Sequence, residues 1–143
     1  MSDDIFGNLR EWGQIPEQIA ELADTGKLDE HQAGLVRILR YRNNWRLREM
    51  ALRSMRDLRA PSNELISEVL SIIADEGVYY EARILAAQAL VDLLTGKGIE
   101  CAEDRDAVLG RVVERMRTVV DSPGPPVLHN VMRECLTTIE NAR

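Results

Sequence analysis

Arginine side chains crowd one stretch of the sequence. Residues 37–59 include eight arginines and only two acidic residues, Glu49 and Asp57, and the aromatic residues Tyr41 and Trp45 fall within the same stretch. Guanidinium groups bind carboxylates and phosphates in a bidentate manner. We therefore expect one face or end of the molecule to be strongly positive and to bind an acidic group. The excess of arginine over lysine, 16 to 2, has a simpler alternative explanation in codon usage.

Other residue types with chemical potential are scattered. His31, His129, Cys101 and Cys135 show no local spacing of the kind that metal sites require. Gly96-Lys97-Gly98 lacks the remainder of a phosphate-binding loop and is interpreted as a helix cap and turn. No serine stands in a nucleophile motif. The sequence thus predicts no catalytic residue, no metal, no cofactor and no enzymatic activity.

Length and composition indicate one soluble domain over residues 1–143. The chain has a net charge of -6 and 45% apolar residues, which is too apolar for a disordered chain. No apolar run approaches the roughly 20 residues of a membrane span. Two cysteines are too few for a disulfide framework, and residues 1–4 are acidic where an export signal would be basic. We expect a cytoplasmic protein that does not enter a membrane.

Apolar residues recur three and four positions apart almost throughout, which predicts an all-helical fold. Proline and glycine mark the breaks, with Gly26 expected as a C-terminal cap, Asp29 as an N-terminal cap, and Pro61-Ser62-Asn63 as a helix start. The expected helical segments are 5–12, 16–25, 29–42, 45–58, 61–76, 79–94, 104–120 and 126–141.

Three of these segments resemble one another. Residues 47–58, 82–93 and 128–139 align without gaps. In each of them a small residue, Ser54, Ala89 or Cys135, is followed directly by a large apolar residue. Small residues let helices approach closely, and large ones fill the space between helix pairs. The equivalent sets are Arg48, Arg83 and His129; Ala51, Ala86 and Met132; Ser54, Ala89 and Cys135; Met55, Leu90 and Leu136; and Leu58, Leu93 and Ile139. Cys135 is therefore interpreted as a buried core thiol.

In these positions the chain resembles HEAT-repeat proteins. The resemblance implies a right-handed α-solenoid of three HEAT-like helix pairs, at 30–60, 61–95 and 104–141, with an N-terminal helical cap at 1–29. It also implies that Arg48 and Arg83 pair with acidic residues between helices, a pattern from which His129 departs. The extra length between the second and third repeats falls at 95–104. This loop is interpreted either as an insertion that the surface tolerates or as a contact with a partner.

A solenoid of this type would line one surface with the second helix of each pair. Trp45 is expected to pack in the core between neighbouring repeats. Tyr79 and Tyr80 either pack there too or are exposed and anchor a partner. The surface would grade from basic in the first repeat to mixed or acidic in the others. The candidate partner-binding residues are Arg42, Arg46, Arg53, Arg56, Glu81, Gln88 and Asp92.

These features favour a non-catalytic protein-protein interaction module or adaptor that binds an acidic partner at the first repeat. The main alternative is a nucleic-acid-binding module that uses the block from Arg37 to Arg59. A small enzyme or lyase accessory is a further alternative. The protein partner would be another protein or a second copy of the chain, because apolar ends of a repeat stack favour self-association.

Overall fold

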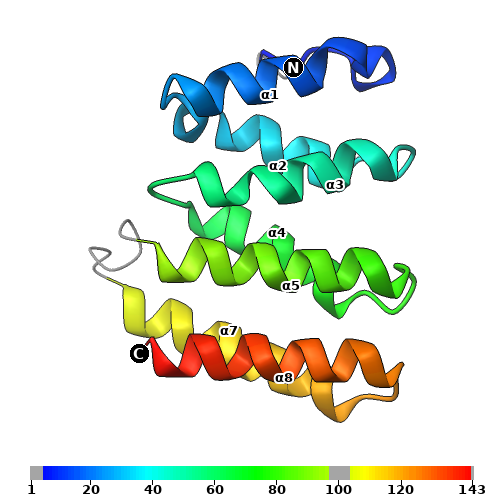
Figure 1. The fold of residues 1–143 in the computed structure, drawn as a ribbon, viewed down its shortest axis with the longest axis vertical. Helices are drawn as coiled ribbons and strands as arrows, with labels where there is room; N and C mark the ends of the chain where they lie inside the picture. The colour runs from blue at the N-terminus through cyan, green and yellow to red at the C-terminus, as the bar shows by residue number, and fades with distance from the viewer. Residues whose placement is uncertain (1–4, 97–103, 143) are drawn as a thin grey trace.

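The computed structural model describes residues 5–96 and 104–142, and this part of the chain contains helices joined by turns, without a strand (Figure 1). The predicted all-helical fold is confirmed. The α-helices are α1 (Ile15–Asp24), α2 (Gln32–Arg40), α3 (Trp45–Arg53), α4 (Asn63–Ala74), α5 (Tyr80–Thr95), α7 (Arg105–Asp121) and α8 (Pro126–Asn141). Three short 3-10 helices, η1 (Leu9–Gln14), η2 (Leu28–His31) and η3 (Ser54–Asp57), accompany the first four.

Two of the 3-10 helices divide segments that the sequence predicted as single helices, whereas η1 occupies Leu9–Gln14, where the sequence predicted a helix over 5–12. The predicted helix 45–58 consists of α3 followed by η3, and the predicted helix 29–42 consists of η2 followed by α2. At the first of these junctions the Ser54 hydroxyl donates to the Ala51 carbonyl at 2.7 Å. Such a bond engages a carbonyl of the helix backbone and bends the helix locally.

Two predicted helix ends are confirmed and a third prediction is wrong. Gly26 has φ 70°, and the Lys27 amide donates to the Leu22 carbonyl, which makes Gly26 the left-handed residue after α1. The Ser62 hydroxyl accepts from the Leu65 amide and caps α4. Asp29 does not cap α2.

Asp29 instead holds the turn that leads from η3 to α4. Its carboxylate accepts from the backbone amides of Arg59 and Ala60, at 3.0 and 2.6 Å. The Gln32 side chain adds a second clamp, because it donates to the Ala60 carbonyl and accepts from the Ser62 amide. These four bonds join Asp29 and Gln32 to the turn at 59–62, about 30 positions further along the chain, a contact that apolar periodicity does not reveal.

The helices form two layers. Figure 1 shows α1, α3, α5 and α8 in front and α2, α4 and α7 behind them. Neighbours in the front layer contact one another, and each rear helix contacts helices of the front layer. The segment 1–29 was predicted to pack on the first helix pair as a cap, and its helix α1 lies beside α3 in the front layer.

The apolar core fills the space between the layers. Met55 and Leu90, two of the large residues of the internal repeat, are completely buried, and the third, Leu136, is partly buried. Ala51, Ala86 and Met132, which share another repeat position, are also completely buried.

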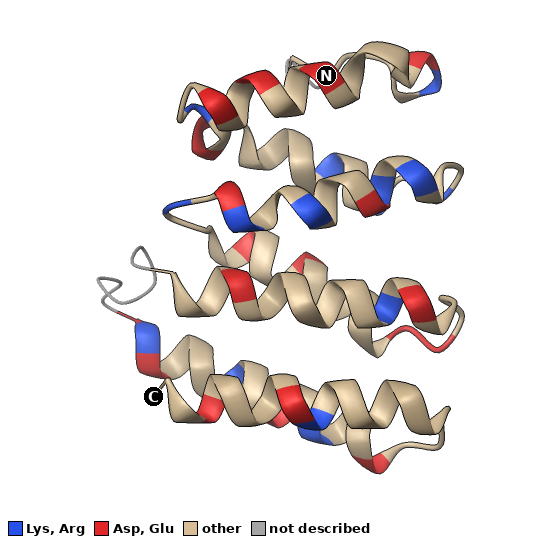
Figure 2. Ribbon diagram, viewed as in Figure 1, with Lys and Arg blue, Asp and Glu red and all other residues tan. Residues whose placement is uncertain are grey.

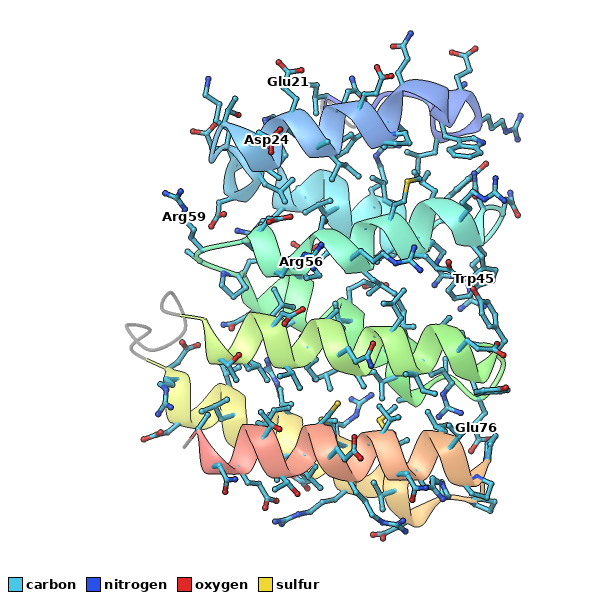
Figure 3. All side chains as sticks on the ribbon, viewed as in Figure 1. Glu21, Asp24, Trp45, Arg56, Arg59 and Glu76 are labelled. Carbon is cyan, nitrogen blue, oxygen red and sulfur yellow. The ribbon has the colours of Figure 1, made fainter. Side chains whose placement is uncertain are left out.

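The ends of the stack are largely polar in the described parts of the chain. Glu21 and Asp24 project from α1 (Figure 3), and Arg111 and Arg115 are exposed on α7. The large apolar side chains that are exposed, Ile5, Tyr79, Tyr80 and Val127, are distributed over several elements.

No helix in the described portion is both long enough and apolar enough to cross a lipid bilayer.

Candidate protein-interaction surface

Three neighbouring grooves lie between the helices of the front layer, and we call them together the front surface. The middle groove, between α3–η3 and α5, has a volume of about 260 Å³. The groove between α5 and α8 has a volume of about 350 Å³ and shares Gln88 and Asp92 with the middle groove. The groove between α1 and α3, of about 200 Å³, shares Arg53 with it. Because neighbouring grooves share wall residues, the three lie side by side over four helices, with the side chains of α3 and α5 between them.

Apolar and polar side chains line the three grooves together. The apolar side chains come from every helix that borders the grooves, and several of them are small, which leaves space between the helix ridges. They are Ile19, Ala20, Ala23 and Met50 in the first groove; Leu52, Leu85 and Ala89 in the second; and Val91, Val131 and Cys135 in the third.

Helical spacing places the polar wall residues on a common side. Gln88 and Asp92 are four residues apart on α5, and Glu134 and Thr138 are four apart on α8, so each pair lies on one helix face. Arg53, the last residue of α3, lies opposite Gln88 across the middle groove. The internal repeat therefore aligns polar residues from different helices along one surface.

Both signs of charge line this surface. The middle groove has Arg53 and Arg56 on its α3–η3 side and Asp92 on its α5 side. Asp57 lines the first groove and Glu134 the third. Figure 2 shows basic and acidic residues on the same front-layer helices. Arg53 is also 3.8 Å from the Glu49 carboxylate on its own helix. Burial raises the pKa of Asp92, and the positive charge of Arg56 opposes that rise, which indicates that these two groups interact across the middle groove.

Cys135 lies in the third groove as a core thiol, as the repeat alignment predicted. Its residue surface is 7% exposed. Burial raises the pKa of its thiol, and the negative charges of Glu134 and Asp92 raise it further. Since the thiolate is the nucleophilic form, the side chain remains a weak nucleophile at neutral pH.

The structure brings together four of the seven residues that the sequence singled out. Arg53, Arg56, Gln88 and Asp92 all line the middle groove. The other three candidates, Arg42, Arg46 and Glu81, do not line the front surface. They are located in the turn after α2 and in the first turns of α3 and α5.

The α1 side of the front surface was missed by sequence analysis. Because residues 1–29 lay outside the repeat alignment, Ile19 and Ala23 were given no place on the surface. Ala20 and Ala23, small residues three apart on an amphipathic helix, are the signal that marks this side of α1 as a place of close approach.

An aromatic corner joins the first turns of α3 and α5. Trp45 is half-buried rather than a core residue, and its ring meets that of Tyr79 edge to face at 5.0 Å. The Tyr79 hydroxyl donates to Glu49. Partial burial, followed by the Glu49 hydrogen bond and charge, raises the pKa of Tyr79 to about 12. Tyr79 and Tyr80 are 37% and 41% exposed, so Tyr79 bridges two helices and also faces solvent.

Two buried arginines occupy equivalent repeat positions. Arg48 and Arg83 are 5% and 7% exposed. The Arg48 Nε donates to the Leu39 carbonyl and the Arg83 Nε to the Ile73 carbonyl, both at 2.8 Å. The expected pairing with acidic residues is thus replaced by hydrogen bonds to the last carbonyls of α2 and α4, which have no partner within their own helices.

The Arg-rich block does not form a single positive face. Arg37 donates to the Gly7 carbonyl, and Arg40 pairs with Glu68 at 2.9 Å. Arg42 lies 3.7 Å from Asp75, while Arg48 is buried. Helical periodicity distributes these residues around two helices, where nearby carboxylates neutralise part of their charge.

Within residues 5–96 and 104–142, no three histidine, cysteine or carboxylate side chains are grouped so as to hold a metal ion. The loop predicted at 95–104 falls mostly on residues 97–103, as do the predicted turn at Lys97-Gly98 and Cys101, and these lie outside the described residues.

Comparison with known proteins gives no relative: no family model, no curated protein and no solved structure matches the chain.

Proposed function

We propose that this chain is a non-catalytic protein-protein interaction module that holds a partner on the front surface. The three neighbouring grooves carry this proposal, because together they place apolar and charged side chains side by side over four helices. Protein-binding surfaces of this kind combine apolar anchoring positions with a polar rim. The cytoplasm is the compartment that we propose for it.

We further propose that the architecture is a right-handed α-solenoid of HEAT-like helix pairs. The support is the recurrence of one contact: Arg48 and Arg83, 35 residues apart, each bind the end of the preceding rear-layer helix. A repeat architecture stacks similar units that contact only their neighbours. The alternation of front and rear helices along the chain agrees with such stacking.

The partner would present an acidic group to Arg53 and Arg56. Both side chains are exposed at the middle groove, where an acidic partner would gain favourable electrostatic interactions. Nucleic acid is less suited as the ligand, because the arginines of the block point to several faces and Arg40, Arg42 and Arg53 already lie near carboxylates.

The test is affinity capture from a lysate of the source organism, with and without nuclease, at low and moderate salt. Three forms of the protein would be compared: the natural chain, the variant Arg53→Glu/Arg56→Glu, and the control Arg111→Glu/Arg115→Glu. The control makes the same change of charge on exposed positions of α7, in the rear layer.

Capture of a protein that survives nuclease, is lost with the Arg53/Arg56 variant and persists with the control would support the proposal. Exposed charges are screened by salt, so capture should weaken as the salt concentration rises. Equal capture by all three forms would refute the assignment of the front surface. Recovery of nucleic acid, with loss of protein after nuclease treatment, would replace the proposal by the nucleic-acid alternative.

A further inference from the structure

A separate groove lies between η1 and the last turn of α2 and shares no lining residue with the front surface. Its volume is about 380 Å³. Arg10 lines it from η1, and Arg37 and Arg40 line it from α2, whereas none of the described residues that line it is acidic. We call it the arginine groove. Its volume lies in the range of about 300–1,000 Å³ that is typical of small-molecule sites.

Local structure brings these three arginines to one groove. Arg37 and Arg40 are three residues apart in the last turn of α2, so they lie on one side of the helix. Gly7 has φ 61°, in the left-handed region, and its carbonyl accepts from the Arg37 guanidinium at 2.7 Å. The Asn8 side chain caps η1 by accepting from the Arg10 amide at 3.0 Å. The bond between Gly7 and Arg37 therefore holds the start of η1 against α2.

Leu9 and Tyr41 supply the apolar part of the groove. Leu9 is buried, and Tyr41 is half-buried and packs against the core. A ligand in the groove would thus meet an aliphatic and an aromatic side chain beside the guanidinium groups. Small-molecule sites typically combine such an apolar lining with a few polar groups that fix the orientation of the ligand.

The arginines of the groove differ in how far their charge is compensated. Within the described residues, the exposed Arg10 side chain makes no hydrogen bond or ion pair. Arg40 donates to Glu68 at 2.9 Å and lies 3.7 Å from Glu64, which moderates its charge. Both carboxylates belong to α4 and do not line the groove. The charges that line the groove are thus all positive.

Other charges lie near the groove without lining it. Glu11 follows Arg10 in the chain and is exposed, and Asp3 and Asp4 lie outside the described residues. The C-terminal end of α2, which carries partial negative charge, is also close. Arg48 offsets that end from the core side through its bond to the Leu39 carbonyl.

This arrangement suits an anion that has several acceptor oxygens. A guanidinium group presents paired N–H donors to a phosphate or a carboxylate. In the arginine groove the donors come from two elements, η1 and α2, so a group with three acceptor oxygens, such as a phosphate monoester, is matched from both sides. A carboxylate has two oxygens, and one guanidinium can engage both.

We propose that the arginine groove binds a small molecule that consists of a phosphate monoester on an apolar or aromatic body. The phosphate lies between Arg10 and the two arginines of α2, and the body lies against Leu9 and Tyr41. The site is separate from the front surface, so the inference does not depend on the proposed function.

Isothermal titration calorimetry of the full chain at low salt tests the inference, with phenyl phosphate as the probe. Inorganic phosphate lacks the apolar body, benzyl alcohol lacks the charge, and benzoate has a carboxylate in place of the phosphate. Phenyl phosphate is expected to bind about tenfold more tightly than each of these three. Amide chemical shifts measured by nuclear magnetic resonance during the same titration should change at Leu9 and Tyr41.

The variant Arg10→Gln should weaken the binding of phenyl phosphate about fivefold, because it removes one exposed ion pair. Arg10 is exposed and its side chain holds no other described residue, so this variant should keep the natural far-UV circular dichroism spectrum. Arg111→Gln, the same change at an exposed position of α7, is the matched control and should leave the affinity unchanged. The front-surface variant Arg53→Glu/Arg56→Glu should also bind phenyl phosphate as the natural chain does.

Absence of binding, or an equal affinity for phenyl phosphate and benzyl alcohol, would overturn the inference. Equal affinities for phenyl phosphate and benzoate would overturn the assignment of a phosphate. An affinity that Arg10→Gln leaves unchanged, or one that the Arg53/Arg56 variant abolishes, would place the bound probe outside the arginine groove and reject the site.

Discussion

Replacing Arg48 by alanine removes a hydrogen bond and an aromatic contact together. The Arg48 Nε donates to the Leu39 carbonyl at 2.8 Å, and the guanidinium carbon lies 3.8 Å from the centre of the Trp45 ring. A hydrogen bond from a charged donor contributes about 1.5–3 kcal/mol. A cation–π contact contributes about 0.5–2 kcal/mol, the higher figure applying where the pair is desolvated.

Desolvation of the guanidinium offsets part of this gain. Burial lowers the pKa of Arg48, and the positive charge of Arg42 lowers it further, so the charged form is less favoured than in water. The alanine variant, however, leaves the Leu39 carbonyl without its partner in the core. We expect a net loss of about 3 kcal/mol in the free energy of unfolding, which corresponds to a decrease of about 10 °C in Tm.

Urea unfolding followed by far-UV circular dichroism would measure this loss. Arg83→Ala is the matched control, since Arg83 makes the equivalent bond to Ile73 and no aromatic contact is recorded for it among the described residues. The control should lose about 2 kcal/mol. A double-mutant cycle with Trp45→Leu would isolate the aromatic term. A change below about 0.5 kcal/mol for Arg48→Ala would refute the reasoning, since no buried hydrogen bond of this kind should be so weak.

Other expectations concern pH, capping and thiol chemistry. The pKa of Tyr79 is raised from 10.0 to about 12 in the folded chain, so its contribution to stability is present below pH 10 and is lost as the pH rises through about 12. In the Tyr79→Phe variant, the free energy of unfolding measured in urea should therefore depend less on pH between 10 and 12 than in the natural chain. Asn44→Ala should cost about 1 kcal/mol in the same assay because the Asn44 side chain caps α3, and Ser62→Ala should cost a similar amount at α4; no loss at either would contradict the capping geometry. In a Cys101→Ser variant, whose one cysteine is Cys135, the thiol with its raised pKa and 7% exposure should react with a maleimide at pH 7 much more slowly in the folded chain than in urea, and equal rates would show that it is accessible.

The presence of the helices was predictable from local signals. The residues at which they begin and end were less predictable. Gly26 and Ser62 act as predicted because a left-handed glycine and a capping hydroxyl work through neighbouring residues alone. Asp29 was mistaken for a cap because its actual partners, the amides of Arg59 and Ala60, are about 30 positions away. The η3 break at Ser54 was missed because one hydroxyl–carbonyl bond does not disturb the apolar periodicity.

The candidate surface was predictable only in part. Arg53, Arg56, Gln88 and Asp92 were found because each is an outward-facing polar residue on the second helix of a predicted pair, and Arg53 and Gln88 are also equivalent repeat positions. Arg42 belongs to a turn whose direction depends on how α2 and α3 pack, so repeat position says little about it. The contribution of α1 was missed because a helix outside the repeat has no equivalent positions from which to infer its neighbours.

The sequence by itself determined that the chain is helical, which residues are apolar enough to enter a core, and which positions recur along it. Those properties depend on spacing within one helix or between similar helices. Only the tertiary structure decided which charged side chains remain available to bind a partner. Arg48 and Arg83 are buried and donate hydrogen bonds to backbone carbonyls, and Arg40 and Arg42 lie beside carboxylates of later segments. The physical reason is that the electrostatic role of a side chain depends on the groups packed against it, and packing brings together residues that are distant in the sequence.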